Sequence, residues 1–503
     1  ILLINVFGRE GNFDFEVAKD YFGSAYGLHA ENTIDDLQDK NIIHFLRYKG
    51  KLTFVEGTDI NIQGELVEAN RKITANLDLD AEFKRLLKLT PVLAKKHYLN
   101  SGTPRFAVFH LSNDLLVKEY SPLDGNTHVL VSTKAQIDTD AEIRCVLGDK
   151  DSLNELIREV LKYEVILEKY TEDFIVKKII EREYSYALDK LLGAFYREVY
   201  TKSTWFIRGK KVRIETQREF NAALSEFFNS KFAGAPVVNN ELINKSVLSP
   251  SINTARRALL RLLLNRYNDP TLSYTAKKFP ADKTIFYSTL VKEGMYNLDS
   301  GVISAPTKSS SYYNAWGAGQ RFLDESRTGK KNIQELIETL KAEPYGLKEG
   351  LLRIWLMFFL VAEEENYALY YSPENKFLPY FSDDIYEAIL KKPHNFLVKR
   401  YNYDKLSNEL IAEYKKSSIY LDQGDEASAR TAYFRIYGEL LSKLKNLEKF
   451  TTHTSSRLSK EAIGFRDSLL KANDPEEALL SLIPNALGFN DVLSISLEDT
   501  SKY

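Results

Sequence analysis

The chain has 503 residues, of which 44% are hydrophobic and 27% are charged, and its formal net charge is −2 at pH 7. This length exceeds what one hydrophobic core organises, so we expect two to four domains. The nearly balanced charge argues against a generally basic nucleic-acid coat, although it leaves room for a local basic patch. Cys145 is the only cysteine, so no internal disulfide can form, which suits a reducing cytoplasm.

Two further features bear on location and completeness. The strongly apolar run Leu351–Ala362 is too short to span a bilayer, and no signal-peptide pattern is present, so we expect a cytoplasmic chain without a membrane partner. Residue 1 is isoleucine, and Met295 and Met357 are the only methionines. We therefore expect an internal or C-terminal piece of a longer protein.

Overall the pattern predicts a mixed α/β fold that is mainly α-helical. Residues 1–75 are predicted to be a winged-helix-like domain. Its expected elements are a strand, two helices and a hairpin, at Ile1–Phe7, Phe15–Phe22, Glu31–Lys40, Ile42–Tyr48 and Leu52–Val55.

The hairpin turn of this first domain carries candidate nucleic-acid contacts. Arg47, Lys49 and Lys51 lie at or beside the turn, where the wing of a winged helix touches phosphates. The second helix carries acidic residues, however, which make it a poor recognition helix: Asp35, Asp36 and Asp39. Winged helices also serve as packing modules after AAA+ ATPase cores, so DNA contact and packing both stay open.

Residues 76–150 are predicted to be a small α/β unit. Its helices are expected at Glu65–Asn76, which begins before the boundary, and at Leu86–Tyr98. Strands are expected at Arg105–Leu111, Val129–Ser132 and Glu142–Leu147. We interpret the lone histidines His97 and His110 as structural.

Residues 151–400 are predicted to be a helical core with short hairpins. Its helices are expected at Leu153–Tyr170, Phe174–Tyr200, Thr216–Ser230, Ile333–Lys341 and Leu351–Ala362, and a second hairpin at Ala368–Tyr371 and Lys376–Pro379. An irregular connection is expected over residues 288–330. There Tyr312, Tyr313 and Trp316 could stack on bases or anchor the loop.

A hairpin at Thr204–Ile207 and Lys211–Ile214 is the second candidate nucleic-acid site. Its basic candidates at and beside the turn are Arg208, Lys210 and Lys211. Trp205 and Phe206 lie beside them, and aromatic side chains next to basic ones bind nucleic acids. The alternative is a surface turn whose aromatic residues point into the core.

The third candidate is a helix that begins at Pro250 with Ser249 as its N-cap. Its apolar residues follow helical spacing, and Arg256 and Arg257 lie mostly off that stripe. The basic face could be a solvated surface, a phosphate-facing surface or a protein interface. After it, residues 401–503 are predicted to form a C-terminal helical bundle, with helices at Tyr403–Ser418, Glu426–Lys445, Lys460–Lys471 and Pro475–Leu482.

Several short segments resemble one family. They are Asn239–Asn244, Ala255–Arg257, Phe279–Pro280, Tyr287 and Pro344–Gly350. Together they resemble the region downstream of the P-loop in the ATPases of the BREX bacteriophage-defence system (BrxC or PglY), over roughly Ser185 to Tyr401. The resemblance implies an antiviral-defence protein, related to AAA+ ATPases, that binds ATP and magnesium upstream and assembles with other defence proteins on DNA.

The chain itself carries no recognisable catalytic, cofactor-binding or metal-binding motif. Thr328–Lys331 is the nearest fragment of a P-loop, but it lacks the first glycine and the final hydroxyl that hold phosphate and magnesium. We therefore expect a non-catalytic part that contacts double-stranded DNA, forms oligomers or docks partners. A stand-alone DNA-binding or scaffold protein is the alternative, and an enzyme of unrecognised class is a third.

Overall fold

The computed structural model describes residues 15–40, 42–54, 61–73, 78–111, 116–117, 125–133, 138–139, 141–148, 150–275, 277–364, 366–374, 376–378, 381–401, 432–472 and 475–488. The fold is mixed α/β and mainly helical, as predicted. The predicted strand Ile1–Phe7 and helix Tyr403–Ser418 lie outside the described residues.

The chain divides into two units, and each is described by itself. Unit 1 consists of Ile1–Leu93, Phe106–Ser121 and Asn126–Leu224, and unit 2 of Ala94–Arg105, Pro122–Gly125 and Ser225–Tyr503. This division differs from the boundary expected at residue 150, because the strands before that point and the hairpin after residue 200 share one sheet.

Unit 1 begins with the order of elements that the sequence predicts for residues 15–55. Helices α2 (Phe15–Tyr26) and α3 (Leu28–Asp39) precede the hairpin of β1 (Ile43–Leu46) and β2 (Lys51–Phe54). Gly27 separates the two helices in a conformation with φ of 84°, which glycine adopts without strain. Ile34, Ile43, Phe45 and Leu52 form a small core between these elements.

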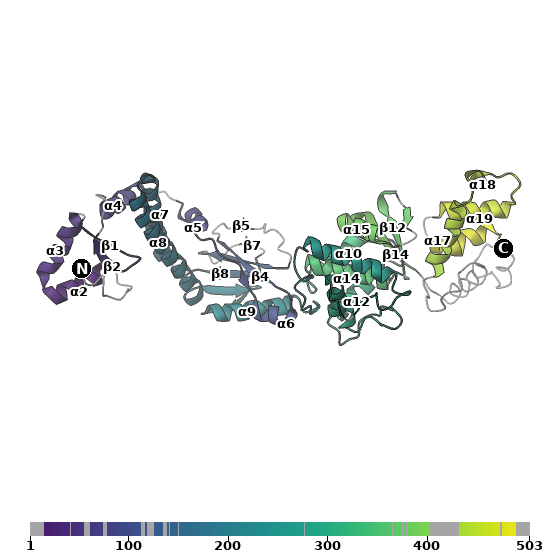
Figure 1. The fold of residues 1–503 in the computed structure, drawn as a ribbon, viewed down its shortest axis with the longest axis horizontal. Coiled ribbons are helices and arrows are strands. Elements are labelled where there is room, and N and C mark those ends of the chain that lie inside the picture. The colour runs from purple at the N-terminus through teal and green to yellow at the C-terminus, as the bar shows by residue number, and fades with distance from the viewer. Residues whose placement is uncertain are drawn as a thin grey trace. The chain divides into compact units, whose positions relative to one another are not determined.

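A six-stranded sheet with the order β10-β9-β8-β6-β4-β3 is the main sheet of unit 1. Its strands are β3 (Val92–Leu93), β4 (Phe106–Leu111), β6 (Thr127–Ser132), β8 (Ile143–Val146), β9 (Thr204–Ile207) and β10 (Lys210–Val212). β4, β6 and β8 are parallel, and β9 joins β8 in the antiparallel direction. A separate short pair is formed by β5 (Leu116–Val117) and β7 (Asp138–Thr139) (Figure 1).

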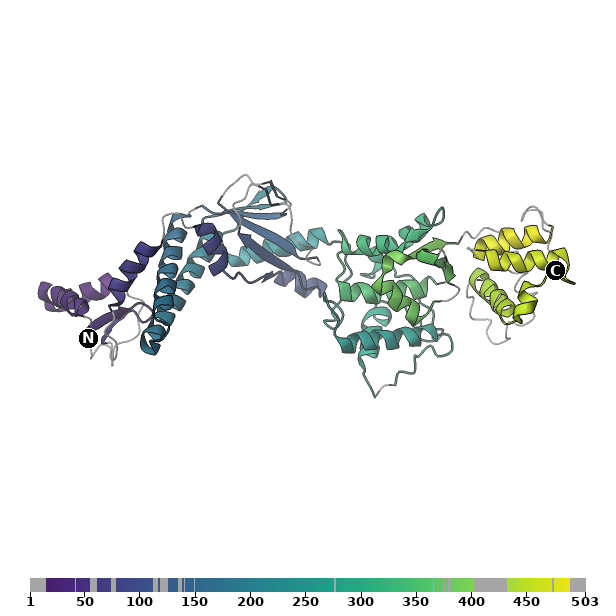
Figure 2. The ribbon, with the colours of Figure 1, turned by 90° about the horizontal axis from the view of Figure 1, so that it is seen from above.

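The helices of unit 1 are α4 (Ile62–Lys72), α5 (Leu79–Leu86), α7 (Asp151–Lys169), α8 (Phe174–Thr201) and α9 (Gln217–Lys231), which continues into unit 2. The long helices α7 and α8 lie side by side, and the Tyr184 hydroxyl donates to Glu164 at 3.1 Å (Figure 2). The helix predicted over Leu86–Tyr98 is confirmed only at its ends, because α5 ends at Leu86, Val92–Leu93 form β3 and helix resumes in α6 (Lys95–Ser101). Pro91 lacks a backbone donor, and the residues after it pair with β4 instead.

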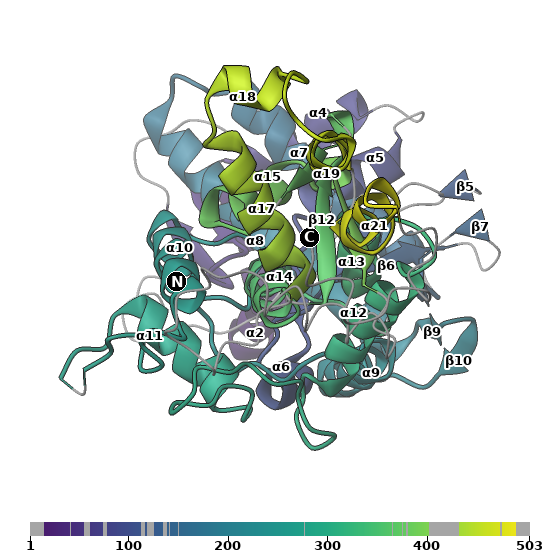
Figure 3. The same ribbon diagram turned by 90° about the vertical axis from the view of Figure 1, so that its right-hand side faces the viewer.

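Unit 2 is packed around α14 (Glu349–Ala362), an almost entirely buried helix (Figure 3). The helices packed with it in one core include α10 (Pro250–Leu264), α12 (Tyr313–Glu325), α13 (Ile333–Lys341) and α15 (Asp383–Lys391). Other helical segments of this unit are α6 (Lys95–Ser101), α11 (Ala281–Phe286), η1 (Tyr287–Val291), η2 (Ser372–Glu374) and η3 (Pro393–Asn395).

The sheet of unit 2 has the order β11-β14-β12-β13 and is antiparallel throughout. Its strands are β11 (Lys331–Asn332), β12 (Tyr367–Tyr371), β13 (Lys376–Leu378) and β14 (Phe396–Arg400). Side chains alternate between the two faces of β12. Tyr367 and Leu369 belong to the core around α14, whereas Ala368 and Tyr370 belong to a second hydrophobic core. The second core packs with the C-terminal helices, which are α17 (Ala432–Lys445), α18 (Lys449–His453), α19 (Lys460–Lys471), α20 (Pro475–Glu477), η4 (Ala478–Leu482) and α21 (Ile483–Ala486).

Helix α12 lies where the sequence predicts an irregular connection. The Trp316 ring lies 6.0 Å from Trp355 and 5.1 Å from Phe359, so it anchors this segment in the core. Gly319 permits the approach, because a Cβ there would stand 2.5 Å from the Phe359 ring. Packing of Trp316 and Gly319 against α14 thus supports a helix for which the glycine-containing sequence has only a weak preference.

We predict opposite effects of alanine at two glycines of α12. Gly319→Ala forces a Cβ into the Phe359 ring and should destabilise unit 2 by about 1–2 kcal/mol. Gly317→Ala meets only the flexible Arg321 end at 3.4 Å and should stabilise it by about 0.5–1 kcal/mol. Urea unfolding followed by tryptophan fluorescence in a Trp205→Phe background measures both. Equal effects of the two substitutions would contradict this packing.

Candidate nucleic-acid interface

Strand β9 presents neighbouring aromatic residues to opposite faces of the unit 1 sheet. Trp205 is fully buried, with its ring centroid 4.8 Å from that of Phe220 on α9. Its Nε1 donates to the Val199 carbonyl oxygen at 3.0 Å at the end of α8. Phe109 of β4 approaches the same Phe220 ring at 5.7 Å. This face of the sheet therefore packs against helices.

The opposite face carries a row of residues that the strand register places side by side. The row runs across five strands through Lys211, Phe206, Arg144, Leu130 and His110. Leu130 is buried, whereas Phe206, Arg144 and His110 are half-buried and Lys211 is exposed. We call this row, together with His128, the open face.

The side chains of the open face contact one another in pairs. The Arg144 guanidinium carbon lies 5.1 Å from the centroid of the Phe206 ring, a cation–π arrangement. His128 Nδ1 and His110 Nε2 are 2.7 Å apart. Burial, and then the charge of His128, lower the pKa of His110, which favours a neutral ring there. Among the described residues, no three His, Cys, Asp or Glu side chains gather to hold a metal ion.

The turn between β9 and β10 consists of Arg208 and Gly209, both with positive φ, 47° and 76°. Arg208 is held in place, since its backbone N donates to the Glu142 carbonyl oxygen at 2.7 Å and its guanidinium pairs with the Glu142 carboxylate at 3.0 Å. Lys210 and Lys211 are exposed on the edge strand. Lysines on an edge strand also prevent pairing between sheets, so their exposure alone does not identify a binding site.

The candidate residues of the first hairpin are partly engaged within unit 1. The Arg47 guanidinium pairs with Glu159 of α7, and its backbone N donates to Glu183 of α8 at 2.8 Å. Lys49 and Lys51 are half-buried, and the Lys49 ammonium lies 5.6 Å from the Tyr48 ring centroid. For Arg47, these contacts support the packing interpretation.

Glu183 is the group through which we expect the attachment of this hairpin to depend on pH. Burial raises the pKa of its carboxyl to about 7, although the hydrogen bond from Arg47 lowers it. A carboxyl with a raised pKa in the folded state favours folding when it is protonated. The contribution of Glu183 to folding stability is fully present below the ordinary pKa of a glutamate carboxyl, and it is lost as the pH rises through about 7.

We predict that amide protection of β1 and β2 falls at least about tenfold between about pH 5 and about pH 8, after correction for intrinsic exchange. Glu183→Gln should remove this dependence, because the amide does not ionise. Glu181→Gln, an exposed change on the same helix, should behave as the unmodified chain. Hydrogen–deuterium exchange with mass spectrometry measures all three. An unchanged pH dependence in Glu183→Gln would assign it to another group.

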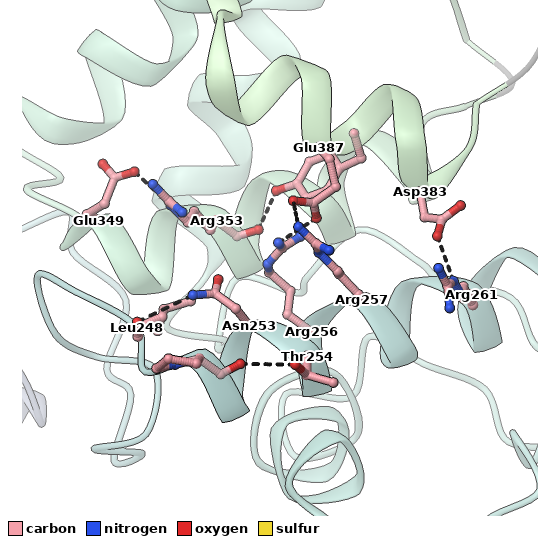
Figure 4. A network of polar contacts seen from close by, with 12 residues as sticks. Leu248, Asn253, Thr254, Arg256, Arg257, Arg261, Glu349, Arg353, Asp383 and Glu387 are labelled. Carbon is pink, nitrogen blue, oxygen red and sulfur yellow. Dashed lines mark hydrogen bonds and ion pairs between the residues drawn. The ribbon is translucent and has the colours of Figure 1, made fainter.

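The structure corrects the prediction of Arg256 as a nucleic-acid contact. Arg256 is 1% exposed and donates to Glu387 of α15 at 2.5 Å, and Arg257 donates to the second oxygen of that carboxylate at 2.8 Å (Figure 4). Arg261 pairs with Asp383 of the same helix at 2.6 Å. The arginine face of α10 is therefore an interface with α15, in which Arg256 is buried while Arg257 and Arg261 keep contact with solvent.

We predict that the carboxylate of Glu387, which two arginines share, contributes more to the stability of unit 2 than the carboxylate of Asp383. Although burial alone raises the pKa of Glu387, its hydrogen bonds to Arg256 and Arg257 bring it below the usual value. The ionised Glu387 carboxylate thus stabilises the folded state above the ordinary pKa of glutamate, and this stabilisation is lost as the pH falls through its lowered pKa.

Glu387→Gln should destabilise unit 2 by about 3 kcal/mol, because it leaves the Arg256 charge buried without a counter-ion. Asp383→Asn, at a pair whose arginine is 68% exposed, should cost less than about 1 kcal/mol. Chemical unfolding at neutral pH compares the two. Similar losses would mean that burial of Arg256 adds nothing to the pair.

The structure thus places the eight predicted residues in three separate sites and adds residues that the sequence analysis missed. Arg144 and His128 were not singled out, and His110 was interpreted as structural. The signal that could have found them is the two-residue period of β4 and β8, which sets Arg144 and His110 on the face opposite Cys145 and Phe109.

A small cavity lies at the carboxyl ends of β4, β6 and β8, the edge where α/β sheets bind ligands. It measures about 30 Å³, room for about two water molecules, and Leu111, Val131, Leu147 and Ile157 are among its lining residues. Among the described residues, no helix is both long and apolar enough to cross a bilayer. A scan against protein-family models and searches of curated proteins and of solved structures found no match to the chain.

Proposed function

We propose that the chain is the nucleic-acid-contacting, non-catalytic part of a larger BREX-type antiviral-defence ATPase. On this proposal, ATP and magnesium bind in an upstream P-loop segment, and the protein works in the cytoplasm as an oligomer with other defence proteins. The segments between Ser185 and Tyr401 that resemble this family support the assignment, and the chain departs from the family in its missing P-loop.

The observation that carries the nucleic-acid contact is the combination of charge and aromatic surface at one edge of the unit 1 sheet. Lys210 and Lys211 are exposed on β10, and Arg144 and Phe206 continue the surface inward from Lys211. Lysine ammonium groups attract phosphates, and this attraction weakens with salt as counterions are released. Of the candidate sites, this one has exposed cations next to an aromatic ring.

A paired charge reversal separates phosphate binding from protection of the sheet edge. Lys210→Glu with Lys211→Glu keeps charged side chains on β10, so the edge stays protected against pairing. We predict that it weakens binding to a DNA duplex more than about tenfold and reduces the slope of log affinity against log salt by about 2, because a duplex along the sheet edge contacts both lysines.

The matched control for this experiment is Lys277→Glu with Lys278→Glu, a pair of neighbouring lysines in unit 2 that has the same change in net charge. Fluorescence anisotropy over a salt series measures the affinities. If the control weakens binding as much as the β10 pair, the contact is a general charge effect. If the unmodified chain shows no salt-dependent binding, the proposed function is wrong.

A further inference from the structure

Resting on the proposed function, we infer that the open face binds unpaired nucleotides, which lie across the strands between Lys211 and His110. The inference names the substrate class of this surface, single-stranded nucleic acid, in place of the double-stranded DNA expected from the sequence.

The open face presents several planar side-chain groups. The Phe206 ring, the Arg144 guanidinium and the imidazoles of His110 and His128 all offer planar surfaces at half-buried positions. Aromatic rings and guanidinium planes stack on bases that are splayed out of a helix. Bases in a duplex are already stacked on one another, so planar groups on a sheet cannot reach their faces.

The row is long enough for two or three bases. Neighbouring strands lie about 4.8 Å apart, so the three steps from Phe206 to His110 span about 14 Å. Sheets that bind single-stranded RNA stack two or three bases on aromatic residues over a comparable width. Half-buried planar groups stand at both ends of this span, Phe206 at one end and the His110–His128 pair at the other, and the buried Leu130 lies between Arg144 and His110.

The open face carries basic side chains where the phosphate backbone of a bound nucleic acid would run. Arg144 and Lys211 belong to the row, and Arg208 lies at its edge beside its partner Glu142. Lys210, by contrast, pairs in register with Ile207 and so faces the opposite side of the sheet. A single strand on the open face contacts Lys211 and leaves Lys210 aside, whereas a duplex laid along the sheet edge meets both lysines.

The test compares three probes by fluorescence anisotropy over the same salt series: oligothymidylate, oligouridylate and a mixed-sequence duplex. We expect the single-stranded probes to bind more tightly than the duplex. Phe206→Leu should weaken single-strand binding about tenfold and leave duplex affinity unchanged, because it removes stacking and keeps an apolar side chain. Phe206→Tyr should retain affinity. A difference between the two single-stranded probes would assign the site to RNA or to DNA.

Two single charge changes test which face of the sheet the nucleic acid contacts. Lys211→Gln should weaken single-strand binding several-fold, and Lys210→Gln should have little effect. Circular dichroism of each variant verifies that the sheet is folded, and Arg144→Lys, which keeps the charge and removes the plane, provides an independent variant that should also weaken binding.

The outcomes distinguish this inference from the proposed function. Salt-dependent binding in which the duplex is preferred, and in which Phe206→Leu and Arg144→Lys change nothing, would overturn the single-strand site and leave the nucleic-acid function standing. An absence of salt-dependent binding to every probe would overturn both.

Discussion

The burial of Trp205 determines which side chains lie on the face of the unit 1 sheet opposite its helices. Its indole packs against Phe220 and donates to the Val199 carbonyl oxygen, so β9 has one register in which its apolar face meets the helices. A shift by one residue would bring Phe206 into the core and Trp205 to the surface. Because β9 pairs with β8, the same register sets Arg144 beside Phe206. The surface that we propose as an interface is thus a consequence of how the core is packed.

The arginines of α10 in unit 2 show that a basic stripe in a sequence does not by itself identify an exposed surface. From the sequence, the basic face of α10 could be a solvated surface, a phosphate-facing surface or a protein interface. In the structure, the carboxylate partner of Arg256 and Arg257 comes from α15, more than a hundred residues further along the chain. Burying Arg256 requires a counter-ion in a defined place, and Glu387 provides it for two arginines at once. The helix itself was predictable, since Ser249 caps it as expected.

Local signals in the sequence predict elements well, and non-local pairing escapes them. The helices α7, α8 and α19 begin and end within a few residues of their predicted bounds, because apolar periodicity and caps are encoded locally. The pairing of β8 with β9 joins residues that are about sixty positions apart in the sequence, and the residue pattern of neither strand predicts this pairing. The candidate site depends on that pairing, so sequence identified its basic tip and missed Arg144 and His128. Helix α12 was missed because Gly317 and Gly319 suggest a loop until their contacts are known.

The most direct test of the central claim is to map where a single-stranded nucleic acid touches the chain. Photo-crosslinking of a bromouracil-substituted oligonucleotide, followed by mass spectrometry of the peptides, reports contact without any mutation. The account predicts crosslinks in peptides that contain Phe206 and His110 or His128, from β9, β4 and β6 of one sheet. Crosslinks confined to the β1–β2 hairpin or to unit 2 would contradict it, because the nucleic acid would then bind away from the open face.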